Sequence, residues 1–129
     1  MSMRISTEVL VVGGGPAGSA AAFWAAQAGR MVVLLEKDVM PRDRVCGDAV
    51  TPKAVGHLAE MGIDVADKRF HKHRGLRMTA HGQSIELRWP TDHDHPSHGL
   101  IIRRNTFDKL LIDHAANEGA QVWTGVEVL

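Results

Sequence analysis

The sequence lacks a second cysteine and lacks an excess of charge of either sign. Its 129 residues include one cysteine, Cys46, and 15 basic residues balanced by 15 acidic ones. A single cysteine cannot form an internal disulfide, which excludes a disulfide-bonded secreted scaffold and favours the reducing cytoplasm. The balanced charge gives no reason to expect nucleic acid as a partner. With 44% hydrophobic and 23% charged residues, the composition is that of one soluble globular domain.

The sequence also lacks an uninterrupted apolar run that would suit a membrane span. The stretch from Val9 to Gly29 carries no charge, but Gly13-Gly14-Gly15-Pro16 falls inside it. Such a break would leave backbone groups unpaired in lipid. We therefore expect a buried strand followed by a buried helix.

Hydrophobic periodicity predicts an α/β fold with a parallel sheet. β-Branched runs at 7–12 and 31–35 flank an alanine-rich stretch at 16–28 that ends at Gly29. Strand, helix and strand at this spacing form a βαβ unit with a right-handed crossover. Alternation at 76–80 and 85–89 around His81-Gly82 adds a β-hairpin.

Further elements follow from capping and breaking residues. Thr51-Pro52 predicts the start of a helix that ends near Met61, because threonine caps and proline suits the first helical turn. Asn105 and Asp108 predict a capped helix that closes at Gly119. The remaining expectations are a loop at 37–50, a polar loop at 92–99, a strand at 100–102 and a final strand containing Val122, Val126 and Val128.

A glycine pattern between the first strand and the first helix predicts dinucleotide binding. Gly13 permits a tight turn, Gly15 lets the backbone approach a diphosphate, and Gly18 lets the helix pack closely on the sheet. The helix N-terminus supplies N–H groups and partial positive charge. Glu36, 18 residues after Gly18, can accept hydrogen bonds from a ribose hydroxyl. The alternative is a purely structural glycine turn.

The acidic residue also restricts the choice of dinucleotide. A carboxylate at Glu36 would repel a 2′-phosphate, which disfavours NADP at this site, whereas FAD and NAD both remain open from the loop alone. Ala17 and Ala22 have small side chains, which we expect to let the helix pack closely against the sheet.

Three motifs resemble those of the geranylgeranyl reductase family of FAD-dependent oxidoreductases. The first is the glycine loop from Gly13 to Ala22, followed by Glu36-Lys37. The second runs from Pro41 to Asp48 with Cys46-Gly47-Asp48 at its end, followed by Thr51-Pro52-Lys53-Ala54. The third is Arg104-Asn105-Thr106-Phe107-Asp108. Together with the run from Arg74 to Met78, they look most like the actinobacterial branch that saturates isoprenoid side chains, including that of menaquinone.

The resemblance implies a Rossmann-like FAD-binding domain with a hairpin insertion and a reaction in which reduced flavin delivers hydride to an isoprenoid C=C bond. NADPH or a ferredoxin-like donor would re-reduce the flavin. The implied cofactor-binding residues are Gly13, Gly15, Pro16, Ala17, Gly18, Glu36, Lys37, Arg44, Cys46, Gly47, Asp48 and Arg104, with Cys46 also implied as a catalytic thiol. The implied partner is an isoprenoid lipid, with a cytoplasmic location and peripheral contact with the membrane.

Family members are much longer than this sequence. We therefore expect residues 1–129 to form a partial FAD-binding domain without the substrate domain. A fragment of an FAD-dependent aromatic monooxygenase and a non-catalytic nucleotide-binding remnant are the alternatives. Cys46 and Asp48 each also have a purely structural interpretation: Cys46 as a small loop residue and Asp48 as a turn residue.

Two other clusters receive mainly structural interpretations. His93, Asp94, His95 and His98 match no compact metal site, so we expect no metal. The basic run of Lys68, Arg69, Lys72, Arg74 and Arg77 is more simply a solvated strand edge than a patch for anionic lipid or for a nucleotide phosphate.

Overall fold

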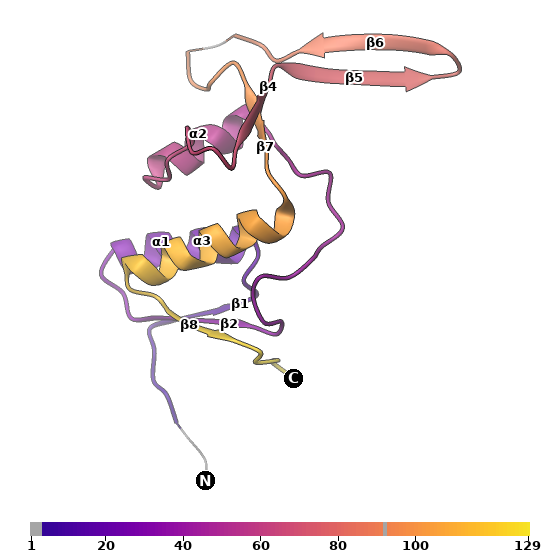
Figure 1. Cartoon of the computed structure of the whole chain (residues 1–129). Coiled ribbons are helices and arrows are strands. Elements are labelled where there is room, and N and C mark those ends of the chain that lie inside the picture. The colour runs from indigo at the N-terminus through magenta and orange to yellow at the C-terminus, as the bar shows by residue number, and fades with distance from the viewer. Residues whose placement is uncertain (1–3, 92) are drawn as a thin grey trace. The chain divides into compact units, whose positions relative to one another are not determined.

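The computed structural model describes residues 4–91 and 93–129, which divide into two compact units. Unit 1 comprises Met1–Arg44 and Arg104–Leu129, and unit 2 comprises Val45–Arg103. The elements, labelled in Figure 1, are β1 (Val9–Val12), α1 (Pro16–Gln27), β2 (Val32–Glu36), β3 (Ala49–Val50), α2 (Pro52–Glu60), β4 (His71–His73), β5 (Gly75–Ala80), β6 (Gln83–Arg88), β7 (Gly99–Ile101), α3 (Arg104–Glu118) and β8 (Gln121–Thr124).

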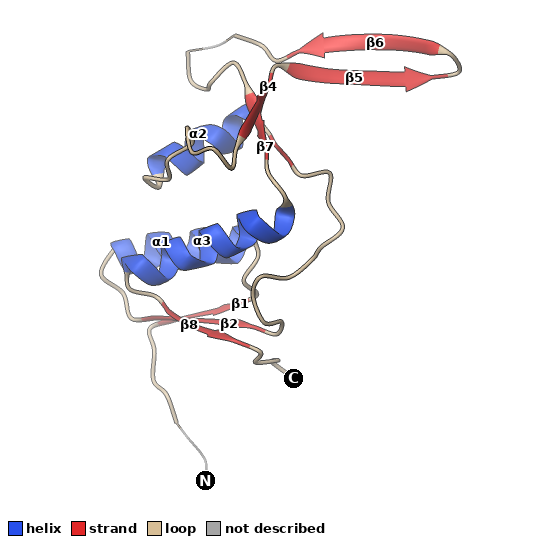
Figure 2. Ribbon diagram, in the orientation of Figure 1, coloured by secondary structure: helices blue, strands red, loops and turns tan. Residues whose placement is uncertain are grey.

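Unit 1 is a parallel sheet with two helices on one face. The strand order is β1-β2-β8, and both strand pairs are parallel. Helices α1 and α3 lie side by side over this sheet (Figure 2). Phe23 and Ala22 of α1, Leu34 of β2 and Leu111 and Ala115 of α3 form a core in which each residue is at most 2% exposed. The predicted α/β fold with a parallel βαβ unit is confirmed.

The uncharged stretch at 9–29 forms β1, the glycine loop and α1, as predicted. Pro16 occupies the first turn of α1, where its missing N–H is not needed. Gly29 follows the helix with φ of +76°, and its N–H bonds to the carbonyl of Ala26. Within the described ranges, no helix has both the length and the apolar character needed to cross a membrane.

The packing role predicted for Ala17 is wrong. Ala22 is fully buried, but Ala17 is exposed in the first turn of α1. Five residues at 3.6 per turn place these two side chains on different faces of the helix, so only one of them can pack against the sheet.

Unit 2 combines a small antiparallel sheet, one helix and a hairpin. β7 lies between β3 and β4, with both pairings antiparallel. Helix α2 begins as predicted, with the Thr51 hydroxyl 3.4 Å from the Ala54 N–H and Pro52 in the first turn. The predicted hairpin is confirmed as β5 and β6, with φ of +51° at His81 and +76° at Gly82 in its turn. β3 and β4 are two and three residues long, too short for periodicity to reveal.

Two predicted boundaries in the last third of the chain are wrong. Helix α3 starts at Arg104, so Asn105 lies inside the helix rather than capping it, and its side-chain oxygen accepts from the Thr106 N–H at 2.7 Å. β8 ends at Thr124, which leaves Val126 and Val128 outside the strand because Gly125, with φ of +73°, breaks the extended backbone. The predicted polar loop at 92–99 is described except for residue 92, which lies outside the described residues.

Candidate functional site

The glycine loop lies at the carboxyl edge of the parallel sheet, where ligands of open α/β folds bind. Gly13 directly follows β1, has φ of +103°, and donates its N–H to the Leu35 carbonyl at 2.8 Å. A Cβ on Gly18 would lie 1.9 Å from the carbonyl oxygen of Gly13. The first helical turn therefore approaches the loop so closely that only glycine fits at position 18.

The N-terminus of α1 carries neither a side-chain cap nor an acidic residue. Gly15 is its N-cap, so the first N–H groups of the helix receive no hydrogen bond from a capping side chain. A Cβ on Gly15 would meet only two atoms within 4 Å, the Nη2 atoms of Arg42 and Arg104, each at 3.8 Å. Helical N–H groups without a side-chain cap, beside two guanidinium groups, form a site suited to an anion.

Glu36, the last residue of β2, holds the glycine loop in place. Its side chain is 3% exposed, and Oε2 accepts the Gly14 N–H at 2.6 Å. Oε1 accepts the Asp38 N–H at 3.0 Å and the Nε–H of Arg42 at 3.3 Å. The carboxylate thus faces the loop, as the sequence predicts, and it also has partners there that the sequence did not reveal.

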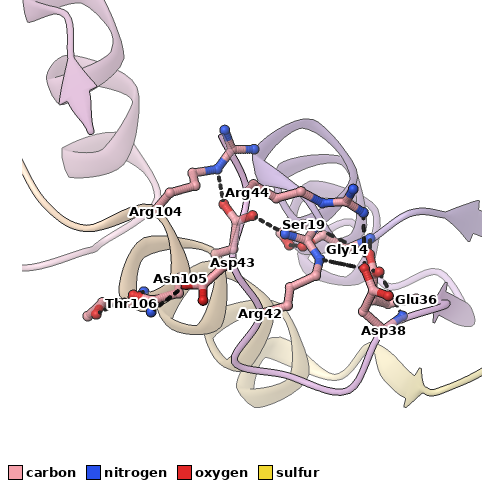
Figure 3. Close-up of polar contacts among 11 residues, drawn as sticks. Gly14, Ser19, Glu36, Asp38, Arg42, Asp43, Arg44, Arg104, Asn105 and Thr106 are labelled. Carbon is pink, nitrogen blue, oxygen red and sulfur yellow. Dashed lines mark hydrogen bonds and ion pairs between the residues drawn. The ribbon is translucent and has the colours of Figure 1, made fainter. Parts of the chain in front are cut away.

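A buried carboxylate on α3 joins the two arginines. Asp108 is fully buried; its Oδ2 accepts from Arg42 Nη1 at 2.7 Å and its Oδ1 from Arg104 Nε at 2.6 Å. Figure 3 shows the Arg42 side chain reaching toward Glu36, with Gly14 and Ser19 close by. We call Glu36, Arg42, Asp108 and Arg104 the ionic chain. It fixes both guanidinium groups beside the glycine loop.

The ionic chain shifts the pKa values of its members. Burial alone would raise the pKa of Glu36, but hydrogen bonds from Asp38, Gly14 and Arg42 outweigh it and hold the pKa below its usual value. Burial would likewise lower the pKa of Arg42, and its bonds to Glu36 and Asp108 raise the pKa instead. Both groups are therefore charged at neutral pH.

Glu36→Gln is expected to destabilise the protein in a pH-dependent way. Because folding lowers the pKa of Glu36, its charge stabilises the fold above the unfolded-state pKa of about 4.5. This contribution is lost as the pH falls through the lower folded-state pKa. Urea unfolding between pH 7 and pH 3 should show a gap between wild type and variant that narrows below pH ~4.5. A gap that stays constant with pH would contradict a role for the charge.

The remaining predicted residues lie at different places in the chain. Pro16 and Ala17 form the first turn of α1, and Lys37 is exposed after β2. Arg44 is exposed and pairs with Asp38 at 3.1 Å, and Asp38 in turn lies 3.6 Å from Arg42 of the ionic chain. Cys46, Gly47 and Asp48 belong to unit 2, where the Asp48 N–H lies 3.4 Å from the Cys46 sulfur.

Two residues of the site were missed by sequence reasoning. Arg42 was passed over in favour of Arg44, although both lie in the same Pro-Arg-Asp-Arg segment. Asp108 was interpreted as part of a capping box, although its spacing from Arg104, i to i+4 on a helix, is one that favours an ion pair.

These features define the chain as a dinucleotide-binding α/β domain whose loop fits a diphosphate. The comparison with protein families identifies the dinucleotide-binding family: the sequence model of the FAD binding domain matches residues 6–129. The chain belongs to this family. The donor set described above fits FAD, since open glycine backbone, a helix N-terminus and two arginines face the place where its diphosphate would bind.

Relatives come from several kinds of flavoprotein. The chain is 41% identical to a menaquinone reductase of Mycobacterium tuberculosis (strain ATCC 25618 / H37Rv) over 129 residues, which is all of this chain and 31% of that protein. A flavin-dependent halogenase of Armillaria mellea is 36% identical over 127 residues, or 96% of this chain and 25% of the halogenase. The chain thus spans about a third or less of the length of these relatives.

Solved structures show the same fold. A flavoprotein/dehydrogenase from Cytophaga hutchinsonii superposes with a TM-score of 0.84 at 29% identity, over 95% of this chain and 31% of the other. A geranylgeranyl bacteriochlorophyll reductase-like protein from Thermoplasma acidophilum gives a TM-score of 0.74 at 33% identity, over 92% and 30%. The predicted resemblance to FAD-dependent oxidoreductases of the geranylgeranyl reductase type is confirmed.

Proposed function

We propose that this chain is the FAD-binding part of a flavin-dependent reductase that saturates an isoprenoid C=C bond, such as one in the menaquinone side chain. The observation that carries the proposal is 41% identity to menaquinone reductases across the whole chain, with no part left unmatched. The reductase-like fold from Thermoplasma acidophilum supports the same chemistry.

The ionic chain and the glycine loop would hold the cofactor. The backbone at Gly13, Gly15, Pro16, Ala17 and Gly18 would receive the diphosphate, and Arg42 and Arg104 would complement its charge. Lys37 and Arg44, which belong to the same unit, would add positive charge at the edge of the cofactor site. Glu36 would accept a hydrogen bond from a ribose hydroxyl. Bound and reduced, the flavin supplies a hydride from its N5 position.

Residues of unit 2 would act on the substrate side. We assign Cys46, Gly47 and Asp48 to the surroundings of the flavin ring. The Cys46 thiol is exposed and can donate a proton to the second carbon of the double bond. Asp48 has φ of +59°, a conformation that non-glycine residues adopt rarely, and it fixes the turn that carries the thiol. If Cys46→Ser kept full alkene reduction, the thiol would not be the proton donor.

The proposal includes an electron donor and a location. NADPH or a ferredoxin-like protein would re-reduce the flavin, and the isoprenoid substrate would bring a cytoplasmic protein into peripheral contact with the membrane.

One assay tests the function directly. The purified protein should show flavin absorbance or acquire it on titration with FAD. Joined to the remaining residues of a full-length menaquinone reductase relative and reduced by dithionite under anaerobic conditions, it should add two hydrogen atoms to the menaquinone side chain. Because dithionite also reduces the quinone ring, the ring is reoxidised in air before tandem mass spectrometry locates the added hydrogens. A hydroxylated product under air with NADPH would instead indicate a monooxygenase. A protein that binds no flavin would indicate a non-catalytic remnant.

A further inference from the structure

Unit 2 contains a cavity lined by positive charge that the proposed FAD site does not use. Its volume is about 520 Å³, and three of its lining residues are Lys72, Arg74 and Arg88. Lys72 lies on β4, Arg74 directly follows it, and Arg88 ends β6. None of the described residues that line it is acidic. We call this the basic cavity.

The structure divides the basic run of the sequence into paired and unpaired members. Arg69 pairs with Asp67, and Arg77 pairs with Glu86 across the hairpin. Within residues 4–91 and 93–129, neither Lys72 nor Arg74 nor Arg88 has an ion-pair partner. Lys72 and Arg74, two members of the run without a carboxylate partner, therefore lie together at the cavity with Arg88, whereas Lys68 does not line it.

The backbone holds these cations in place. The Trp89 N–H bonds to the Arg74 carbonyl at 2.9 Å, which fixes the strand end that carries Arg88 beside the one that carries Arg74. The Trp89 indole, which also lines the cavity, packs edge-on against His73 with ring centroids 5.8 Å apart. The cavity thus has one aromatic wall, against which the organic part of a ligand can pack.

Neutral polar groups complete the lining. Thr91 and Ser97 contribute hydroxyl groups, and His98 contributes an imidazole whose buried Nε2 has no hydrogen-bond partner in the described part of the chain. Burial, and then the charges of Lys72 and His73, lower the pKa of His98. Burial and the nearby positive charge thus both favour the neutral imidazole.

We propose that the basic cavity binds a phosphate ester group, with the three cations complementing its charge and the hydroxyls and His98 donating hydrogen bonds. Guanidinium groups suit phosphate oxygens, and a cluster of like charges that lacks acidic partners is relieved by an anion. The phosphate could belong to a soluble nucleotide or to a lipid headgroup, and the chemistry of recognition is the same for both. None of the described residues that line the basic cavity belongs to the glycine loop, and the proposal does not depend on the proposed function.

The test follows His98 by NMR while the protein is titrated with inorganic phosphate. Because His98 itself lines the basic cavity, its signals report on binding there. Saturation should raise the pKa of His98 by roughly one unit, since a nearby anion stabilises the imidazolium. The double variant Lys72→Gln/Arg88→Gln should weaken phosphate binding by about tenfold. The matched control Arg77→Gln removes a cation from the same hairpin that already has a partner, and it should bind as wild type does.

Vesicle sedimentation distinguishes the two sources of phosphate. Binding to phosphatidylglycerol vesicles, absent with phosphatidylcholine and lost in the double variant but not in Arg77→Gln, would identify a lipid headgroup. Phosphate binding without vesicle binding would identify a soluble phosphate ester. The proposal is overturned if neither phosphate nor phosphatidylglycerol affects the His98 signals, or if the double variant binds both as wild type does.

Discussion

Asp108→Ala is expected to lower the free energy of unfolding by about 3–5 kcal/mol, the largest effect of any single substitution considered for this chain. Asp108 is fully buried and accepts a hydrogen bond from each of two arginines. Removing it takes away the shortest ion pair of the Arg42 guanidinium, whose side chain is 8% exposed, and leaves Glu36 at 3.3 Å and Asp38 at 3.6 Å as its acidic partners. A buried charge that loses its partner costs far more than the pair itself contributes.

The matched control is Asp113→Asn on the same helix. Asp113 pairs with Lys109 at the surface, with side chains 52% and 41% exposed, so its loss should change stability by only about 0–1 kcal/mol. Urea unfolding of both variants at neutral pH makes the comparison. Asp108→Asn, which keeps the volume and one acceptor, separates loss of charge from loss of packing. Equal effects of Asp108→Ala and Asp113→Asn would contradict the role of the ionic chain.

The parts of the fold that depend on local sequence could be predicted. The glycine loop, the βαβ unit, the cap at Thr51 and the hairpin turn at His81-Gly82 each follow from steric or hydrogen-bonding requirements of a few adjacent residues. The position of Glu36 opposite the loop could be predicted for the same reason, because two neighbouring parallel strands end at the same edge of the sheet.

The partners within the site could not be predicted, because they join segments that are far apart in the sequence. Arg42 and Arg44 have the same chemistry and are two residues apart, and only the packing of α3 buries one of them against Asp108, 66 positions away. In the sequence, Asp108 fits two patterns: the spacing of a helix-capping box with Asn105 and the i,i+4 spacing of an ion pair with Arg104. The choice between them depended on a helix start that sequence patterns locate to within a few residues only.

Gly18→Ala is expected to lower mainly the stability of the protein, and Gly15→Ala mainly its affinity for FAD. A Cβ on Gly18 would lie 1.9 Å from the Gly13 carbonyl, a backbone atom that cannot rotate away, so this variant should lose about 1–3 kcal/mol of stability or more. A Cβ on Gly15 meets nothing closer than 3.8 Å, and its φ of −77° is ordinary for alanine. Gly15→Ala should therefore fold with a loss of at most about 1 kcal/mol, because alanine is a poorer N-cap than glycine. It should weaken FAD binding by about tenfold or more, because its methyl group would occupy the space that the diphosphate needs.

Urea unfolding combined with FAD titration separates the two effects, and Gly56→Ala is the control. Gly56 lies within α2, where an added Cβ makes only ordinary contacts at 3.7 Å and 3.8 Å. Alanine there should raise stability by about 0.5–1 kcal/mol, since glycine is unfavourable inside a helix, and should leave FAD affinity unchanged. If Gly15→Ala bound FAD as tightly as Gly56→Ala does, the backbone at the tip of α1 would not contact the diphosphate. The site would then have to be sought elsewhere, because only direct approach of a ligand makes a methyl group at that open position matter.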